Sequence, residues 1–256
     1  MIVSASDLRN NFSEYLSKVT ENNEEVIITK NNVRVARLVP YVSDIERYFT
    51  VKENAINYDY ERKTISFDEF MEIYEKSNTR MEFINGEIYV LSSPSIFHQA
   101  VLGNLYIVFK EYFKDKKCKP FLAPFDVIFR KKDIRDPNSI KDIKEPDLLQ
   151  PDLIVLCDLE NNINEKGRYT GIPSLTLEIL SASTKNIDLI YKLNTYMTSG
   201  VSEYWIVDPD NKTIMIYSFK NYRIDKNDFY KMGEIAKSFK FEGLSVNVES
   251  IFEELF

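Results

Sequence analysis

The chain has 256 residues, of which 44% are hydrophobic and 13% aromatic, so it can bury the core of one large domain or of two unequal ones. Its formal net charge of −7 and pI near 5.1 disfavour a broadly basic surface for nucleic acid, although a local basic patch is compatible with them. The single histidine, His98, excludes a multi-histidine zinc site within one chain, but not a hard metal held by carboxylates.

The apolar pattern carries no membrane or export signal. No apolar run approaches the ~18 residues that span a bilayer, and the N-terminus MIVSASDLRNNF lacks the basic and apolar regions of a signal peptide. The two cysteines, Cys118 and Cys157, form no C-x-x-C pair, and their spacing predicts no disulfide framework. We therefore expect a cytoplasmic protein with no membrane partner.

Residues 1–45 are predicted to form a small unit. Ser4 or Ser6 can cap a helix whose apolar residues recur at helical spacing, at Leu8, Phe12, Leu16 and Val19. Two short strands follow, EVIIT and VRVARLV, and the KNN between them is typical of a tight turn. About forty residues can hardly bury enough surface to fold alone, so we expect this unit to pack on the rest of the chain or to dimerise.

The same segment, VSASDLRNNFSEYLSKVTENNEEVIITKNNVRVARLVPY, resembles the N-terminal half of prevent-host-death (Phd/YefM) antitoxins. The shared pattern is a strand, S-x-x-R-x-N-F, a helix, V-I-I-T with a basic residue, and V-A-x-L-V-P. The resemblance implies a homodimer that binds operator DNA, with Arg9 and Lys30 as phosphate contacts; alternatively, both are ordinary solvated charges. Because the segment holds five acidic and five basic side chains, DNA affinity would come from local geometry and dimer avidity. The toxin-wrapping tail of those antitoxins has no counterpart here.

Residues 46–63 show no clean period and are interpreted as a linker to a second domain at 64–256. That domain begins with SFDEFMEIYEKS, whose S-x-x-E start is a capping-box pattern and predicts a short helix. Asn85-Gly86 stands between two alternating runs and predicts a β-hairpin. A long helix with an apolar stripe is expected over about 95–116.

The next part of the second domain alternates between strand and helix patterns. Strands are predicted in KPFLAPFDVIFR, PDLIVLCD and PSLTLEILS, and then a helix in TKNIDLIYKLNTYMTSG, which Gly200 ends. Two more strands follow, SEYWIVD and KTIMIYSF. The three strands are expected to form a meander, and the helix a crossover to a parallel strand. The order is therefore helix, three strands, helix, strand, in an α/β (α+β) fold.

The strand SLTLEIL contains a carboxylate among apolar residues. Its period of two gives one face to Leu175, Leu177 and Ile179, and the other to Thr176, Glu178 and Leu180. If helices cover the sheet, Glu178 lies in a half-buried layer, where an unpaired carboxylate costs several kcal/mol. A cation or metal would then have to satisfy it. The alternative is a strand face that is open to water.

Two further residues can join Glu178. Asp152 opens the strand PDLIVLCD after a proline, where a turn is the simpler interpretation. Lys192 lies on the following helix, with Asp188 one turn before and Tyr196 one turn after, which is also typical of a surface ion pair. An aspartate at the start of one strand, a glutamate inside the next and a lysine on the adjoining helix can converge. Two carboxylates with waters suit Mg²⁺, and a lysine can orient a water, as phosphodiester hydrolysis requires.

The same elements resemble the Uma family of restriction-endonuclease-like proteins, in the PD-(D/E)XK nuclease superfamily, over roughly residues 60–256. The motifs are MEFINGEIYVLSSPSIFHQAVLGNL, QPDLIVLCD, GIPSLTLEILSAST, DLIYKLNTY and GVSEYWIVDP. The resemblance implies a restriction-endonuclease-like core in which Asp152 and Glu178 hold Mg²⁺ or Mn²⁺. The E-x-K of the superfamily would put its lysine at Leu180, so the catalytic lysine is expected on the helix instead, at Lys192.

Two residues of the first motif are weaker candidates. His98 lies near the start of the long helix, matches a family histidine near the expected site and is a catalytic candidate; a core or cap histidine is the alternative. Glu82 also matches the family pattern, but we interpret it first as a hairpin residue.

We therefore expect a Mg²⁺-dependent DNA endonuclease fused to an antitoxin-like, DNA-binding dimerisation unit, without a small-molecule cofactor. One alternative is a non-catalytic transcriptional regulator built on a nuclease fold. Another is a toxin that is restrained in cis by its antitoxin-like segment.

Overall fold

The computed structural model describes residues 1–22, 26–31, 33–38, 64–136, 140–181 and 187–253. The chain divides into two compact units, Met1–Arg62 and Lys63–Phe256. The linker predicted at 46–63 lies outside the described residues. Within the described ranges, no helix combines the length and the apolar character needed to cross a membrane.

The N-terminal unit is a three-stranded sheet with two helices. Its elements are β1 (Ile2–Ser4), α1 (Ala5–Asn10), α2 (Phe12–Asn22), β2 (Val26–Lys30) and β3 (Val33–Leu38), and β2 pairs parallel with β1 and antiparallel with β3. Ser4 caps α1 by accepting a hydrogen bond from the Asp7 N–H at 3.1 Å. The prediction of one continuous helix is wrong. Asn11 interrupts it with a non-helical backbone (φ −123°, ψ 30°), and its side-chain amide donates to Asp7 Oδ1 at 2.7 Å.

The core of the unit differs in part from the expected apolar stripe. The buried cluster consists of Val3, Tyr15, Val19 and Val26. Two residues of the expected apolar stripe, Phe12 and Leu16, are instead 49% and 40% exposed. The stripe is therefore only partly correct, because Tyr15, four residues before Val19, is buried where Phe12 and Leu16 were expected.

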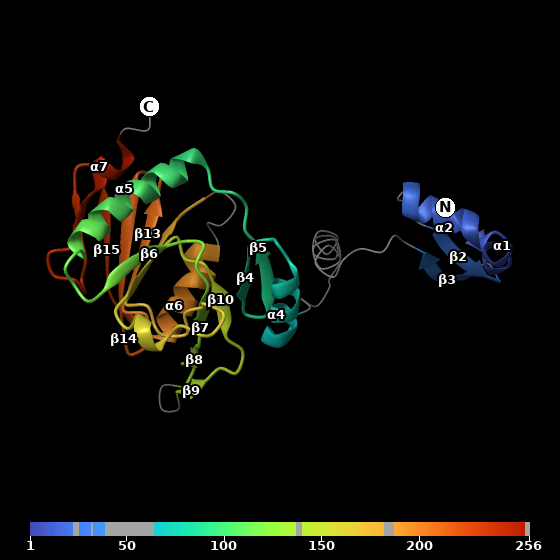
Figure 1. The fold of residues 1–256 in the computed structure, drawn as a ribbon, viewed down its shortest axis with the longest axis horizontal. Helices are drawn as coiled ribbons and strands as arrows, with labels where there is room; N and C mark the ends of the chain where they lie inside the picture. Colours follow the sequence, from blue (N-terminus) through green and yellow to red (C-terminus); the bar gives the residue numbers. More distant parts are fainter. Residues whose placement is uncertain (23–25, 32, 39–63, 137–139, 182–186, 254–256) are drawn as a thin grey trace. The chain divides into compact units, whose positions relative to one another are not determined.

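The second unit is built on a six-stranded mixed sheet with the order β15-β14-β13-β12-β11-β6 (Figure 1). Its strands are β6 (Lys119–Leu122), β11 (Leu153–Leu156), β12 (Leu175–Ile179), β13 (Glu203–Asp208), β14 (Thr213–Lys220) and β15 (Arg223–Lys231). As predicted, β6, β11 and β12 form an antiparallel meander, and β12 pairs parallel with β13. The crossover contains η3 (Ile187–Lys192) and α6 (Leu193–Ser199), and α5 (Ile96–Tyr112) precedes β6. The predicted order of helix, three strands, helix, strand is confirmed.

A second, four-stranded sheet has the order β5-β4-β10-β7. Its strands are β4 (Met81–Ile84), β5 (Glu87–Val90), β7 (Val127–Phe129) and β10 (Asp147–Leu149). The predicted hairpin is present, with positive φ at Asn85 and Gly86. The helix α4 (Phe67–Lys76) begins with the predicted capping box of Ser66 and Glu69. The single strand expected in KPFLAPFDVIFR is wrong, because it divides into β6 and β7 around Pro124, which has no N–H for a ladder.

Shorter elements complete the unit. Two strand pairs are β8 (Lys132–Asp133) with β9 (Lys141–Asp142), and β16 (Ile235–Lys237) with β17 (Ser245–Asn247). The remaining helices are η2 (Leu159–Asn161) and α7 (Val248–Phe252).

The six-stranded sheet has an apolar cluster on each face. On one face α5 (green in Figure 1) packs over the sheet, and its cluster includes Leu175, Leu177, Ile179 and Trp205. On the other face, α6 and the second sheet bury Leu180, Tyr196 and Tyr204. The predicted division of the β12 side chains between two faces is confirmed. Glu178 is only 3% exposed and so lies in a closed layer.

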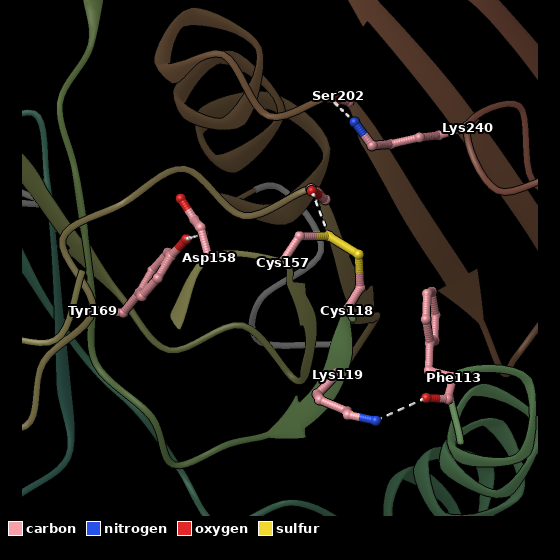
Figure 2. Close-up of a disulfide and its surroundings, with 9 residues drawn as sticks. Phe113, Cys118, Lys119, Cys157, Asp158, Tyr169, Ser202 and Lys240 are labelled. Carbon is pink, nitrogen blue, oxygen red and sulfur yellow. Dashed lines mark hydrogen bonds between the residues drawn. A yellow bond between two sulfur atoms is a disulfide. The ribbon is translucent and has the colours of Figure 1, made fainter. Parts of the chain in front are cut away.

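Cys118 and Cys157 form a disulfide, which the sequence did not predict (Figure 2). They are 39 residues apart in the sequence. However, they continue the antiparallel register of β6 and β11 by one pair beyond Lys119 and Leu156, so their Cα atoms lie 4.0 Å apart. Spacing alone could not reveal this bond, because it depends on how two distant strands pair.

This disulfide should stabilise the unit by restricting the unfolded chain. For a separation of 39 residues, we expect Cys118→Ser/Cys157→Ser to lose about 4 kcal/mol of unfolding free energy under oxidising conditions. Urea unfolding with and without dithiothreitol measures this effect. In reducing buffer the variant and the wild type should unfold at nearly the same urea concentration, and identical midpoints in oxidising buffer would contradict the expectation.

Candidate functional site

The candidate site is organised by a buried lysine. The Nζ of Lys192 lies 3.0 Å from Glu178 Oε1, 3.1 Å from Glu82 Oε1 and 3.3 Å from Asp188 Oδ1. All four side chains are almost completely buried. The interpretation of Asp188 and Lys192 as a surface ion pair is therefore wrong, because the second sheet closes over their face of the main sheet.

The lysine and the three carboxylates come from three elements. Glu178 is in the middle of β12, Glu82 lies in β4 of the hairpin, and Asp188 and Lys192 lie four residues apart on η3. Side chains four residues apart project from the same side of a helix, so the amine and the Asp188 carboxylate meet. Glu82, which we interpreted first as a hairpin residue, is thus part of this cluster as well as of the hairpin.

Neutral donors also reach two of these carboxylates and the backbone of the third residue. The hydroxyl of Tyr196 donates to Glu178 Oε1, and the Gln150 backbone N–H donates to Glu82 Oε1 at 2.9 Å. The hydroxyl of Tyr204 donates to the backbone carbonyl of Asp188 at 3.1 Å. Tyr196 lies one turn after Lys192, so the helical spacing indicated that it would lie near the lysine. The sequence did not predict the contacts of Gln150 and Tyr204.

Burial and mutual contact set the charges of the cluster. Burial raises the pKa of Glu178 well above its ordinary value, although the Lys192 ammonium opposes this. Burial alone would lower the pKa of Lys192, but Glu178, Glu82 and Asp188 outweigh it and raise that pKa well above the usual range. The pKa of Glu82 is raised as well, mainly by burial. With all three carboxylates ionised, one ammonium would leave a formal excess of two negative charges, and the raised pKa values of Glu178 and Glu82 reflect the cost of that excess when no further cation is bound.

Asp152 and His98 meet beside this cluster. The Nε2 of His98, in the first turn of α5, lies 3.1 Å from Asp152 Oδ2, and the Ile179 N–H donates to the same oxygen at 2.8 Å. Ile179 directly follows Glu178 in β12, so this hydrogen bond fixes Asp152 next to that strand. The charge of Asp152 is among those that raise the pKa of Glu178. The structure thus pairs Lys192 with Glu178 and His98 with Asp152 beside the same strand, while their catalytic and metal-binding roles stay predictions.

The carboxylates share a pattern that bears on metal binding. Donors from the described residues reach only one oxygen each of Asp152, Glu178 and Glu82, namely Oδ2, Oε1 and Oε1. The described residues contain no cluster of three or more His, Cys, Asp or Glu side chains arranged to hold a metal. Two carboxylates with waters nevertheless suffice for Mg²⁺. A divalent cation would also offset the formal excess of two negative charges, so the donor set fits such an ion.

Leu180 occupies the position where the superfamily pattern would place a lysine. Its side chain is buried in the apolar cluster with Tyr196 and Tyr204. The amine instead reaches Glu178 from the helix, through Lys192. The expected relocation of the lysine therefore gives a direct contact with the carboxylate.

A second buried ion pair lies between the hairpin and α6. Lys131 Nζ lies 2.7 Å from Asp147 Oδ1 and donates to Asn85 Oδ1 at 2.6 Å. The Asn85 N–H donates to Asp147 Oδ1 at 2.9 Å, and the Thr195 hydroxyl donates to Asp147 Oδ2 at 2.6 Å. Asp147 thus joins the hairpin turn to the helix. Sequence reasoning missed it, since an aspartate in EPDLLQPD looks like a loop residue.

The predicted DNA contacts lie in the other unit. Arg9 is at the end of α1 and Lys30 at the end of β2, and both are exposed. Exposure is what a phosphate contact requires, but it is equally expected of a solvated charge.

Comparisons with known proteins match both units. Residues 67–249 match the model of the Uma2 family, described as "Putative restriction endonuclease", and residues 1–53 match that of "Antitoxin Phd_YefM, type II toxin-antitoxin system". The solved structure of a putative nuclease belonging to DUF820, from Anabaena variabilis, is similar with a TM-score of 0.56 and 20% identity, over 73% of this chain and 97% of that one. At this identity the likeness shows the fold alone. No curated protein matches the chain.

The balance of charge around Lys192 predicts opposite effects of two substitutions. Without divalent ions, Lys192→Met should destabilise the second unit by about 3–5 kcal/mol, because it leaves three buried carboxylates without a cation. Glu178→Gln should keep or raise stability, because Lys192 retains two carboxylates and one costly charge is removed. Urea unfolding in EDTA measures both effects. Equal stabilities of the two variants would contradict the proposed balance.

Proposed function

Because the chain belongs to the Uma2 family, we propose that it is a metal-dependent endonuclease that hydrolyses phosphodiester bonds of DNA. The observation that carries this proposal is the buried Lys192 held against Glu178, next to Asp152. A purely structural ion pair would not need the formal excess of negative charge that surrounds this lysine. Such an excess suits a site that receives a cation.

Asp152 and Glu178 would hold the ion, Mg²⁺ or alternatively Mn²⁺. When bound, the ion would supply a more acidic water and a counter-charge for the phosphate. Oxygens Oδ1 of Asp152 and Oε2 of Glu178 are the proposed ligands, because the protein's described hydrogen bonds to these residues go to the other oxygen of each. Such hard carboxylate oxygens are the ligands that these ions prefer.

The remaining residues act by position and charge. The Lys192 ammonium stays protonated, because the carboxylates around it raise its pKa, so it acts as a hydrogen-bond donor rather than as a base. It would orient the attacking water or stabilise negative charge that develops on the phosphate. His98 would hold Asp152 in place through Nε2. Tyr196 would fix the orientation of the Glu178 carboxylate through its hydroxyl.

One observation favours a second candidate, a non-catalytic regulator on a nuclease fold. Lys192 has three carboxylate partners within 3.3 Å, so the cluster is held together without any ion. In this alternative, the N-terminal unit would control transcription or restrain a toxin, and the second unit would only associate with it. The two candidates differ in whether divalent ions bind and whether DNA is cut.

We further propose that the N-terminal unit forms a homodimer and binds DNA. Its exposed apolar residues support dimerisation, since a unit of this size leaves them uncovered: Ile2, Phe12, Leu16, Val33 and Val35. Arg9 and Lys30 would contact phosphates. This unit would bring the nuclease unit to DNA by raising its local concentration.

The cytoplasm is the proposed place of action, because DNA is there. A disulfide is uncommon in that compartment. The thiol state of Cys118 and Cys157 in cells, trapped by alkylation, tests this assignment. Cysteines that are fully bonded in cells would indicate an oxidising compartment and contradict it.

The nuclease proposal predicts that metal binding and cleavage fall together. Asp152→Asn and Glu178→Gln should weaken Mn²⁺ binding in calorimetric titration and should slow plasmid nicking by about a hundredfold or more, the scale of losing one electrostatic contact to the transition state. Lys192→Met should abolish nicking but largely retain metal binding in the molecules that are folded.

Asp133→Asn is the matched control, because the described ion pair of Asp133 is with the exposed Arg135 and not with a residue of the cluster, so the change should affect neither quantity. Equal Mn²⁺ binding by wild type and Glu178→Gln would refute the metal site. Metal binding without any nicking would favour the non-catalytic alternative.

The DNA-binding proposal predicts a steep dependence on salt. Arg9→Ala/Lys30→Ala should weaken binding of any duplex. The slope of log affinity against log salt concentration should become less steep by about two, because two fewer phosphates are neutralised and fewer counterions are released. Fluorescence anisotropy over a range of salt concentrations measures this. Sedimentation of the same samples should show dimers of both proteins. Unchanged binding would place the contact surface elsewhere, and a monomeric wild type would contradict the dimer.

A further inference from the structure

A polar hollow of about 410 Å³ lies in the second unit next to the candidate site. It is lined by the end of α4 and the residues that lead into β4, by the segment before β7, and by the loop around Gly167. Its charged side chains include Arg80, Lys166, Arg168 and Asp126. None of the residues proposed above to hold an ion or a water lines this hollow.

The cations of the hollow differ in their partners. Lys166 pairs with Glu75, and Arg168 pairs with Asp126 at 3.1 Å and with Glu75 at 3.4 Å. Arg80 has no carboxylate partner among the described residues, and its Nε donates to the neutral Gln150 amide oxygen at 3.0 Å. A guanidinium has five N–H donors in a planar fork. Arg80 therefore supplies a positive charge and further donors that the described protein groups do not take up.

Gln150 connects this hollow to the buried cluster. Its backbone N–H donates to Glu82 Oε1, while its side chain accepts from Arg80 and donates to Tyr74 and Asp126. The Leu91 N–H donates to the Arg80 carbonyl at 3.0 Å, which extends the hairpin pairing by one residue. Arg80 and Glu82 are two residues apart on this extended strand, so their side chains point to the same face.

We propose that this hollow binds a backbone phosphate of the DNA strand, next to the phosphate that is cut, with Arg80 as its main contact. The proposal rests on the function proposed above. Planar guanidinium donors match phosphate oxygens better than a lysine does. The chain as a whole is acidic. Arg80 has no carboxylate partner among the described residues and lies two residues from Glu82, so it is a specific place at which a polyanion can bind. Arg80 would then determine which phosphate of the DNA strand lies next to Lys192.

The test is anisotropy of a fluorescent DNA duplex on the full chain, in EDTA to prevent cleavage. The parent protein and each variant of it carry Arg9→Ala/Lys30→Ala, so that DNA binding by the N-terminal unit does not mask the effect. Arg80→Gln should weaken binding for all sequences and reduce the salt slope by about one. Arg80→Lys should restore the slope but only part of the affinity, because the charge is kept and the fork is lost. Arg135→Gln, an exposed arginine outside the hollow, should leave both nearly unchanged.

The outcomes distinguish a DNA phosphate contact at Arg80 from a free-phosphate site and from the hydrolysis proposed above. Equal affinity and slope for Arg80→Gln and its parent would overturn it, as would an equal loss in Arg135→Gln. An effect of Arg80→Gln on inorganic phosphate binding but not on the duplex would identify a free-phosphate site and overturn it too. If Arg80→Gln lowers the slope as expected while the wild type shows no nicking with Mg²⁺, the phosphate contact stands and the hydrolysis proposed above fails.

Discussion

The contact of Lys192 with three carboxylates is the interaction on which the rest of the second unit depends. A buried charge is costly unless it is paired, and the partners come from different places: Glu82 from β4, Glu178 from β12 and Asp188 from the helix of the lysine itself. One cation thus determines how the hairpin, the main sheet and the crossover meet. The same low-dielectric surroundings that make the charge costly also strengthen each of its contacts.

The buried pair of Lys131 and Asp147 makes the arrangement more rigid. Asp147 accepts from the hairpin turn and from Thr195, which lies one turn beyond Lys192. The hairpin and the helix are therefore held together at two points rather than one. With two points of attachment, Glu82 and Lys192 are held at their contact distance by the second pair as well as by their own.

Features set by neighbouring residues could be predicted from the sequence, and features set by distant pairing could not. The capping box at Ser66 and the Asn85-Gly86 turn each follow from a few adjacent residues, and the two faces of β12 follow from its period of two. By contrast, the Cys118–Cys157 bond and the approach of Glu82 to Lys192 depend on how strands far apart in sequence pair and pack. Glu82 was undervalued for a further reason, since a strong hairpin signal already explained it.

The way the carboxylates are held has a consequence for metal binding. Because Lys192 and Tyr196 both reach Oε1 of Glu178, and His98 and Ile179 both reach Oδ2 of Asp152, each carboxylate is oriented by the protein alone. In small metal domains the ion itself drives folding, and the binding site does not exist without it. Here the lysine supplies the positive charge that folding needs. Binding of a divalent ion would therefore change the charge of a site already in place, and its free energy would not have to support the fold.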